Sequence, residues 1–350
     1  MNKNLMIKLL ETPGISGREE LVVEIIKKEI KKNNLELERD NLGGIWGIKT
    51  SSNSKAKTIL IDSHLDEVGF MVTSIMPNGM IRFINQGGIW NLTLNSQRLR
   101  VWTSDFSKSY SGVVLYPNTN THQAKGNTPE IKDMLLDIGA TSKKEVEKWG
   151  IKQGDSITFD TKVEINGNRV IGKAADNRVG VAIVIELMKF IKDKKFDYNI
   201  VIGASSQEEV GLRGVRAATN KYNPDLAFVI DVSPARDISL PKEPDGILGA
   251  GTMLRHKDAA TIYPSKIIDY LRKIIKDNDI KYQDYFSLGG TNAGMIHLQQ
   301  EGRPVFPFGI VARNLHTSSL IFDIKDYDYT LKLIELILLD LNTNKIVKLI

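Results

Sequence analysis

The stretch 58-TILIDSHLDEVG-69 joins a short apolar run to a cluster of polar side chains. Its first part, Thr58–Ile61, has the length and apolar character of a strand buried in a sheet. His64, Asp66 and Glu67 follow at the end of that run. In open α/β sheets, ligands bind beyond the carboxyl ends of the strands. The stretch therefore predicts a buried strand that leads directly into a polar site.

The C-terminal half of the chain continues this pattern with further apolar strands separated by helices. Beyond about residue 166 the hydrophobic periodicity predicts helices at Asn177–Lys192, Leu212–Thr219, Ser265–Asp277 and from about Asp326, and strands at Ile200–Ala204, Leu226–Val232 and Val305–Ile310. Helices that alternate with short apolar strands are typical of a sheet covered on both faces. We expect an α/β fold with a mostly parallel sheet sandwiched by helices.

Residues 69–165 have a different pattern, in which short strand-like segments alternate with turns rich in Gly, Asn and Pro. The segments are Phe70–Ile75, Met80–Ile84, Gln97–Trp102, Ser111–Leu115 and Ser156–Thr161. This spacing predicts a small β-barrel or sandwich. We therefore expect residues 1–68 and 166–350 to form one α/β domain, interrupted by a β-rich insertion at 69–165.

The N-terminal segment predicts two helices around a Thr-Pro-Gly turn. The first helix is expected at Asn4–Glu11. Ser16 and Glu19 lie three residues apart, which is the spacing of a capping box, and apolar residues follow at helical intervals. This spacing predicts that Ser16 and Glu19 cap the second helix.

The composition narrows the classes of function. The 350-residue chain has 47 Lys and Arg against 42 Asp and Glu; its basic residues are spread along the sequence, so nucleic-acid binding is not expected. It has no cysteine, which excludes disulfides, thiolate metal sites and cysteine nucleophiles. Lys8 and Glu11 interrupt the apolar N-terminus, and no segment reaches the length of a membrane span. We expect a cytoplasmic protein with no membrane contact.

Residues suited to metal binding recur at the ends of the predicted strands and before one helix. They are His64, Asp176, Glu208, Glu209, Asp231 and His316. Each has an ordinary explanation when taken alone: Asp176 as a helix cap, the two glutamates as first-turn residues, Asp231 as a turn residue and a single histidine as a structural or solvated group.

Together, these six residues predict a metal centre. Two histidines and four carboxylates at one sheet edge would form a dense negative site that is costly unless cations occupy it. Oxygen-rich sites with one imidazole per ion suit zinc, manganese or cobalt. Asp66, two residues after His64, can orient the imidazole. If Glu208 and Glu209 are helical, they project roughly 100° apart, so that one can bind metal while its neighbour faces the attacking water.

An ordered set of motifs along nearly the whole chain resembles the tetrahedral glutamyl/leucyl aminopeptidases, a family of dizinc metallopeptidases sometimes mislabelled as endoglucanases. The motifs include Ser16-Gly17-Arg18-Glu19, the 63–69 stretch SHLDEVG, Asp137-Ile138-Gly139-Ala140, the 175–180 stretch ADNRVG, the 207–214 stretch QEEVGLRG, Asp231-Val232, Gly249-Ala250-Gly251, Gly289-Gly290-Thr291 and His316-Thr317.

The resemblance implies two divalent cations per subunit, zinc or else cobalt or manganese. Asp176 would bridge them, with His64 and Asp231 at one ion and Glu209 and His316 at the other. Glu208 would be the general base for a water activated by the two metals, and Asp66 would orient His64. The family's PDZ-like insertion mediates dimerisation, and its dimers form a dodecamer that admits short peptides.

Some residues depart from the family pattern, and these departures leave substrate preference open. Asn292, Leu315 and Leu320 stand where the family often has Asp, Tyr and Glu. An acidic preference would need a cation in the pocket, for which Arg255 and Lys257 are candidates. The remaining histidines, His122, His256 and His297, are interpreted as structural or surface residues.

Three alternatives remain open at this point. The adjacent pair Glu208 and Glu209 could belong to a glycoside hydrolase, although such a pair must flank a sugar from opposite sides. A related metallo-carboxypeptidase or deacylase could use the same residues. The departures from the family pattern also admit a catalytically inactive assembly or binding protein.

Overall fold

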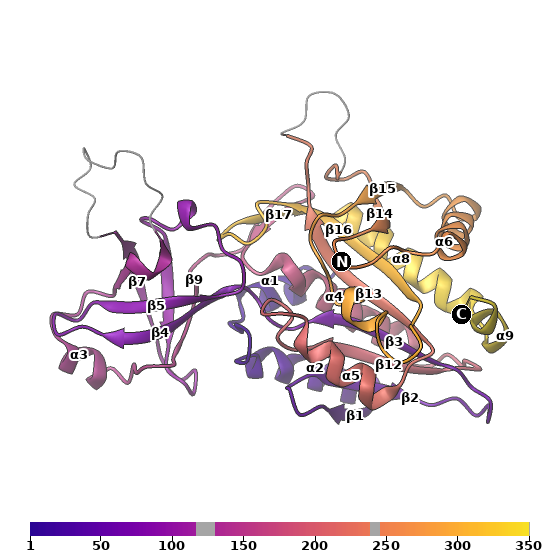
Figure 1. Ribbon diagram of the computed structural model, residues 1–350, viewed down its shortest axis with the longest axis horizontal. Helices are drawn as coiled ribbons and strands as arrows, with labels where there is room; N and C mark the ends of the chain where they lie inside the picture. The colour runs from indigo at the N-terminus through magenta and orange to yellow at the C-terminus, as the bar shows by residue number, and fades with distance from the viewer. Residues whose placement is uncertain (117–129, 239–245, 350) are drawn as a thin grey trace.

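The computed structural model describes residues 1–116, 130–238 and 246–349. Figure 1 shows a large body, with a central sheet and helices, and a smaller, mainly β lobe at one end of an elongated molecule. The chain enters the small lobe after β3 (Thr58–His64) and returns to the sheet at β10 (Glu164–Asn166). Within the described ranges, no helix is long and apolar enough to cross a membrane.

The large body is built on a nine-stranded sheet with the order β1-β2-β12-β3-β13-β16-β17-β11-β10. The strands not yet defined are β1 (Glu36–Arg39), β2 (Ile45–Lys49), β11 (Arg169–Gly172), β12 (Asn199–Ser205), β13 (Leu226–Pro234), β16 (Val305–Arg313) and β17 (Leu320–Asp323). The four central strands, β12, β3, β13 and β16, are parallel, and the outer pairs are antiparallel.

The predicted α/β fold is confirmed, with parallel pairing confined to the centre of a mixed sheet. The pairs β1–β2 and β10–β11 are joined by turns of a few residues, which can connect only antiparallel strands. The central strands are separated by helices or by the whole small lobe, which is long enough for parallel crossovers.

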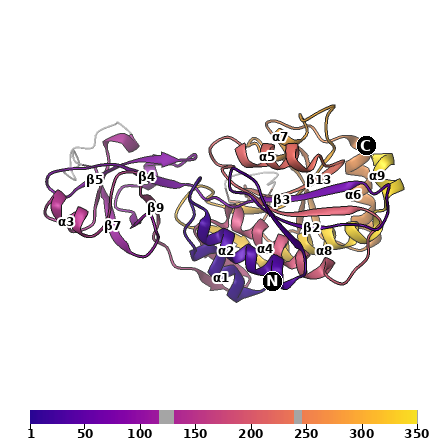
Figure 2. The same ribbon diagram turned by 90° about the horizontal axis from the view of Figure 1, so that it is seen from below.

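Helices cover both faces of the sheet (Figure 2). One face carries α1 (Lys3–Glu11), α2 (Glu20–Lys32), α4 (Ala175–Ile191) and α8 (Ile324–Asp340), and the other carries α5 (Arg213–Tyr222) and the short α7 (Ala293–Ile296). α4 packs directly against β3 and β13 and is buried along almost its whole length. The remaining elements of this body are β14 (Thr252–Lys257), α6 (Ser265–Asp277), β15 (Tyr282–Phe286) and α9 (Thr343–Leu349).

The small lobe is a closed six-stranded barrel with the order β4-β5-β8-β7-β6-β9. Its strands are β4 (Gly69–Ile75), β5 (Ile81–Gln86), β6 (Arg98–Trp102), β7 (Ser109–Leu115), β8 (Leu135–Asp137) and β9 (Ser156–Phe159), and it carries α3 (Lys143–Lys148). Phe70 fills the centre, with its ring 5.1 Å from Phe83 and 5.7 Å from Phe159. The predicted β-barrel is confirmed, and it has a hydrophobic core of its own.

The register of the central strands decides where the polar residues meet. Ser205 of β12 pairs with His64 of β3, and Asp231 of β13 pairs with Gly309 of β16. Because these strands are parallel, their carboxyl ends lie at one edge of the sheet. Residues that are far apart in the sequence therefore converge there.

Candidate metal centre

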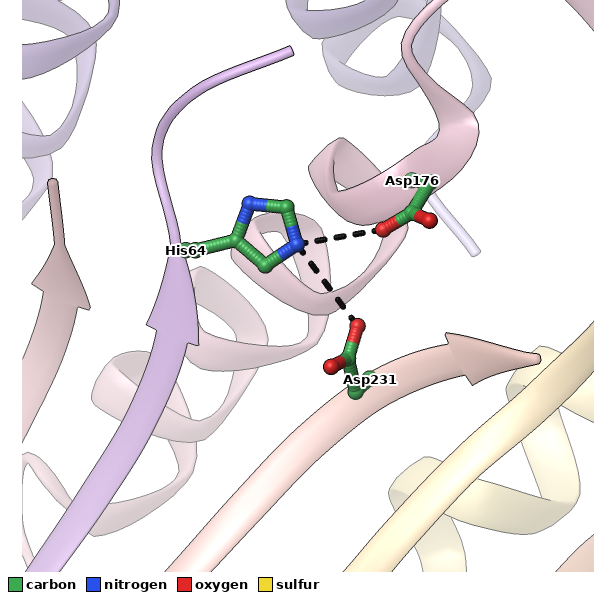
Figure 3. A group of neighbouring side chains, drawn as sticks. All are labelled: His64, Asp176 and Asp231. Atoms are coloured by element: carbon green, nitrogen blue, oxygen red, sulfur yellow. Dashed lines mark hydrogen bonds and ion pairs between the residues drawn. The ribbon is translucent and has the colours of Figure 1, made fainter. Parts of the chain in front are cut away.

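The first group of converging side chains surrounds His64, the last residue of β3. Its Nε2 atom lies 3.1 Å from Oδ1 of Asp176 and 3.6 Å from Oδ1 of Asp231. Figure 3 shows that the two carboxylates, from the start of α4 and from β13, point at the same imidazole nitrogen. The ligand atoms of these three buried residues lie within 4.8 Å of one another, which is close enough to share one ion.

A second group shares Asp176 with the first. Nε2 of His316 lies 3.6 Å from Oδ2 of Asp176 and 3.5 Å from Oε2 of Glu209. Asp176 therefore presents one oxygen to each histidine. His316 itself has a left-handed φ of 58°, a conformation that is uncommon in non-glycine residues and that concentrates at functional sites.

The beginning of α4 holds Asp176 in place. Asp176 has extended backbone angles (φ −82°, ψ 106°), so the regular helix begins after it. Asn177 supplies the helix cap, since its Oδ1 accepts the N–H of Gly180 at 3.1 Å. Its Nδ2 donates to the carbonyl of Ile230 at 2.7 Å and ties α4 to β13. The alternative interpretation of Asp176 as a helix cap is wrong, and its carboxylate is free to face both histidines.

Asp66 is fully buried and contacts residues of both groups. Nδ1 of His64 lies 3.1 Å from the backbone carbonyl of Asp66 and 3.4 Å from its carboxylate. The carboxylate accepts the backbone N–H groups of Glu208 at 3.0 Å and Glu209 at 3.1 Å. Ser16 donates its hydroxyl to the same carboxylate at 2.5 Å. Asp66 thus contacts the imidazole of His64 and bonds to the turn that carries both glutamates.

The capping box predicted for Ser16 and Glu19 is wrong. α2 begins at Glu20, and its N-cap residue, Glu19, makes no side-chain cap. Oε1 of Glu19 instead accepts the N–H groups of Gly17 at 2.8 Å and Gln207 at 3.2 Å. A buried polar group cannot bond to water and therefore needs a partner within the protein. Ser16 and Glu19 accordingly bond to groups at the sheet edge.

Glu208 and Glu209 lie in the turn between β12 and α5, not in a helix as their predicted divergence assumed. Oε2 of Glu208 is 3.9 Å from Nε2 of His64, whereas Glu209 faces His316. The two adjacent glutamates therefore face different histidines. The turn separates their side chains, as the predicted helix was expected to do.

Burial and the crowding of carboxylates decide the protonation of the site. Burial raises the pKa of Glu208 well above its ordinary value, and the charges of Asp231 and Asp176 add to this effect. Burial acts in the same direction on Asp176, yet the imidazoles of His316 and His64 hold its pKa below the ordinary value. Burial lowers the pKa of His64, but the surrounding carboxylates outweigh it and raise that pKa well above the usual range.

The donor set fits divalent cations. Burial, together with the charge of Asp176, raises the pKa of Glu209 well above its ordinary value. Oε1 of Glu209 is also buried with no hydrogen-bond partner among the described residues. Crowded carboxylates are costly without a cation, and an imidazole with several carboxylate oxygens suits zinc, manganese or cobalt. A bound cation would satisfy both the excess charge and the unpartnered oxygen.

A cavity of about 730 Å³ opens beside these groups and is lined by both bodies of the molecule. The barrel contributes Trp90, Thr93 and Gln97 from the segment between β5 and β6. A Cβ atom placed on Gly88 would lie 3.4 Å from Nδ1 of His316, so the barrel segment passes directly over that imidazole. The sequence pattern gave no local signal for this contribution, because it depends on how the barrel packs against the sheet.

The residues that depart from the family pattern lie outside the two groups. Asn292 is buried and donates to Oδ2 of Asp62 at 2.7 Å and to Oγ of Ser205 at 2.9 Å. Leu320 is buried in β17, and Leu315 lines the cavity. The departures therefore leave the clustered side chains intact.

The other described histidines make local contacts away from the cavity. Nε2 of His256 lies 2.6 Å from Asp284, and Nδ1 of His297 lies 3.0 Å from the carbonyl of Ala293. The interpretation of His122 as a structural or surface residue concerns a position outside the described residues.

Two histidines and four carboxylates lie at the carboxyl edge of parallel strands, beside a cavity. This donor set is suited to divalent cations, and it lies where α/β enzymes bind their ligands. The family model of the M42 glutamyl aminopeptidases matches residues 43–333. The chain belongs to this family of peptide hydrolases, and the resemblance drawn from its motifs is confirmed.

Similarity to known proteins extends over nearly the whole chain. The glutamyl aminopeptidase of Lactococcus lactis subsp. cremoris is 36% identical over 349 residues, with 97% of each chain covered. An aminopeptidase from the archaeon Desulfurococcus kamchatkensis has a TM-score of 0.93 and 31% identity, covering 99% of this chain and 96% of that one. The Pyrococcus horikoshii TET1 peptidase, which can assemble into a tetrahedron or a large octahedral shell, has a TM-score of 0.86 and 28% identity, with 97% and 99% covered.

Proposed function

We propose that this aminopeptidase is a two-metal enzyme that removes N-terminal residues from short peptides, with Glu208 as its general base. The observation that carries the proposal is the shared carboxylate of Asp176, whose two oxygens face two different histidines. His64 and Asp231 would complete one ion site, and Glu209 and His316 the other.

The bound ions, zinc or else cobalt or manganese, would polarise the scissile carbonyl and acidify a water molecule. Glu208 accepts a proton from that water as the water oxygen bonds to the carbonyl carbon. The same carboxyl group then delivers the proton to the leaving amine as the carbon–nitrogen bond breaks, which is the usual exchange of general acid–base catalysis. Asp66 keeps His64 oriented and holds the N–H groups of Glu208 and Glu209 in place.

The two parts of the chain have separate roles in this proposal. Residues 1–68 and 166–350 form the catalytic domain, and 69–165 form an oligomerisation domain. The likeness to the Pyrococcus horikoshii peptidase, which can assemble into a tetrahedron or a large octahedral shell, supports a large homo-oligomer. In this proposal dimers form a dodecamer, whose enclosed sites would admit short peptides. A cytoplasmic location stays a prediction from the sequence.

Hydrolysis of fluorogenic aminoacyl amides by the purified full-length protein tests the proposal. Activity should be lost on dialysis against a chelator and return with zinc, cobalt or manganese. Substrates with blocked N-termini should not be cleaved, and their turnover would instead favour a carboxypeptidase or deacylase. Cellulose cleavage that survives chelation would favour the glycoside hydrolase alternative.

A further inference from the structure

We propose that Glu19 is a positioning residue for Glu208: it holds the turn after β12 so that the proposed general base faces the metal centre. The inference rests on the proposed function and adds to it a residue that acts through Glu208. The observations that carry it are the contacts of Glu208, the hydrogen bonds of its turn and the way in which Glu19 is itself held.

The carboxylate of Glu208 is placed by its backbone. Among the described residues it makes no hydrogen bond, and Nε2 of His64, its ion-pair partner, lies 3.9 Å away, which is too far for a hydrogen bond. A carboxylate without such a bond keeps its direction only if the turn that carries it is fixed. The position of the proposed proton acceptor therefore depends on the groups that bind the backbone of this turn.

Two buried carboxylates hold the turn by three consecutive N–H groups. Oε1 of Glu19 accepts the N–H of Gln207 at 3.2 Å. Oδ1 and Oδ2 of Asp66 accept those of Glu208 at 3.0 Å and Glu209 at 3.1 Å. Gln207 has a left-handed φ of 55°, and a non-glycine residue keeps that conformation only where its surroundings hold it. Glu19 supplies such a bond directly before the proposed base.

The loop before α2, which carries Glu19, is itself fixed to the rest of the domain. The N–H of Gly14 donates to Oε1 of Glu67 at 3.1 Å, and the N–H of Glu67 donates to the carbonyl of Gly14 at 3.0 Å. The buried guanidinium of Arg178 binds the same carbonyl at 3.1 Å. Oε1 of Glu19 also accepts the N–H of Gly17 at 2.8 Å. The carboxylate that binds the turn is therefore oriented within a fixed loop.

A role in capping α2 does not account for Glu19. It is the residue before α2 but makes no side-chain cap for that helix. Burial raises its pKa to about 7, and the charge of Asp66 adds to this effect. Such perturbed groups concentrate at functional sites. The role assigned here needs only an acceptor for an N–H group, which the ionised and the neutral carboxyl group both provide.

A double-mutant cycle tests whether Glu19 acts through Glu208. It measures kcat on a short peptide with the metal-loaded, full-length protein for the wild type, Glu19→Ala, Glu208→Gln and the double variant. Glu19→Ala should lower kcat by about ten- to a hundredfold, as expected for a displaced catalytic group, with little change in KM. In the double variant the loss should be close to that of Glu208→Gln alone, because residues that act as a unit have non-additive effects.

The leaving group provides a second measurement. Glu208 would donate a proton to the departing amine, and a strongly basic alkylamine needs that proton more than an arylamine does. Glu19→Ala should therefore slow the cleavage of a peptide bond more than that of an aminoacyl aryl amide. A loss of stability without displacement of the base would slow both reactions equally.

Conservative variants separate the acceptor from its charge. Glu19→Gln keeps an oxygen at the same reach and should retain most of kcat. Glu19→Asp keeps the charge but is one methylene shorter and should behave like Glu19→Ala. Asp225→Ala is the matched control, because Asp225 accepts the N–H of Thr58 at 2.9 Å, at the start of β3 and thus at the opposite edge of the sheet. It should lower stability and leave kcat unchanged.

Losses of kcat that multiply in the double variant would overturn the inference, and so would a normal kcat in Glu19→Ala. If Glu19→Ala does not fold, Glu19→Asp takes its place in the cycle. Near-normal turnover in Glu208→Gln is a different result, which overturns the proposed general base and the inference with it.

Discussion

At the scale of single residues, the site depends on side chains that each contact two partners. Asp176 faces two histidines, and Asp66 holds His64 as well as the turn of Glu208 and Glu209. Because these side chains have two partners each, a substitution that changes one atom can remove one contact and keep another. Metal binding and proton transfer can therefore be tested with different variants.

Glu208→Gln is expected to retain the bound metal and to lose turnover by about 10²–10⁴-fold, the usual contribution of a general base. The amide keeps the shape of the carboxylate but cannot accept a proton from water. Metal content by mass spectrometry and kcat on an aminoacyl amide are the measurements. Glu301→Gln, at an exposed loop position, is the matched control, and near-normal turnover in Glu208→Gln would remove that residue from the mechanism.

Ser16→Ala should lower both stability and kcat, because it removes the 2.5 Å bond to the buried carboxylate of Asp66. A hydrogen bond to a charged group contributes about 1.5–3 kcal/mol, which denaturant unfolding would measure. The exposed Ser52→Ala should change neither quantity. If Ser16 were a helix cap, as its spacing from Glu19 suggested, stability alone would fall and kcat would not.

At the scale of elements, the barrel and the sheet meet at the glycine-containing segment after β5. Gly87 has a φ of +85°, and a Cβ atom there would lie 2.8 Å from Cγ1 of Val68 and 3.2 Å from Cβ of Glu209. The first of these distances is shorter than a normal carbon–carbon contact. Glycine at this position therefore permits the close approach of the barrel to one of the proposed metal ligands.

Gly87→Ala should weaken metal binding at the site of Glu209 and His316 and reduce kcat, because the new methyl group displaces Glu209. Gly139 is a matched control, since its φ is +80° and a Cβ atom there meets nothing within 4 Å. Gly139→Ala should show a comparable backbone cost without the change in metal content. Metal titration by calorimetry makes the comparison, and equal affinities in the two variants would contradict it.

At the scale of the whole molecule, the two groups of side chains join segments from most of the sequence. The proposed ligands come from β3, the start of α4, the turn after β12, β13 and the loop after β16. Cations bound there would cross-link the sheet edge and relieve the repulsion between buried carboxylates. Folding and metal binding should therefore be thermodynamically linked.

Removal of metal should lower the melting temperature of the protein, and the addition of zinc should restore it. A ligand at one hundred times its dissociation constant stabilises the folded state by about 2.7 kcal/mol, which differential scanning calorimetry resolves. Asp176→Asn should abolish most of this shift, because the residue faces both histidines. A melting temperature that does not respond to chelation would show that no cation contributes to the fold.

The sequence by itself determined the class of the fold and the identity of the clustered residues. Apolar runs such as Thr58–Ile61, each ending in metal-binding residue types, identify strands whose carboxyl ends share one edge. The period of the hydrophobic pattern also distinguished the β-rich insertion from the α/β domain, because this pattern depends on residues that are close together in the sequence. The helix Ser265–Asp277 was predicted with the bounds that the structure gives.

Only the tertiary structure decided which partners those residues meet. Ser16 and Glu19 match a capping box in sequence, yet they bond to Asp66 and to the N–H of Gln207, because buried groups far along the chain offer partners that a local pattern does not contain. The wall that the barrel forms beside the cavity has the same origin. The spacing of residues along the sequence predicts the period of a helix or strand, whereas the distances between side chains in the core depend on how the whole chain folds.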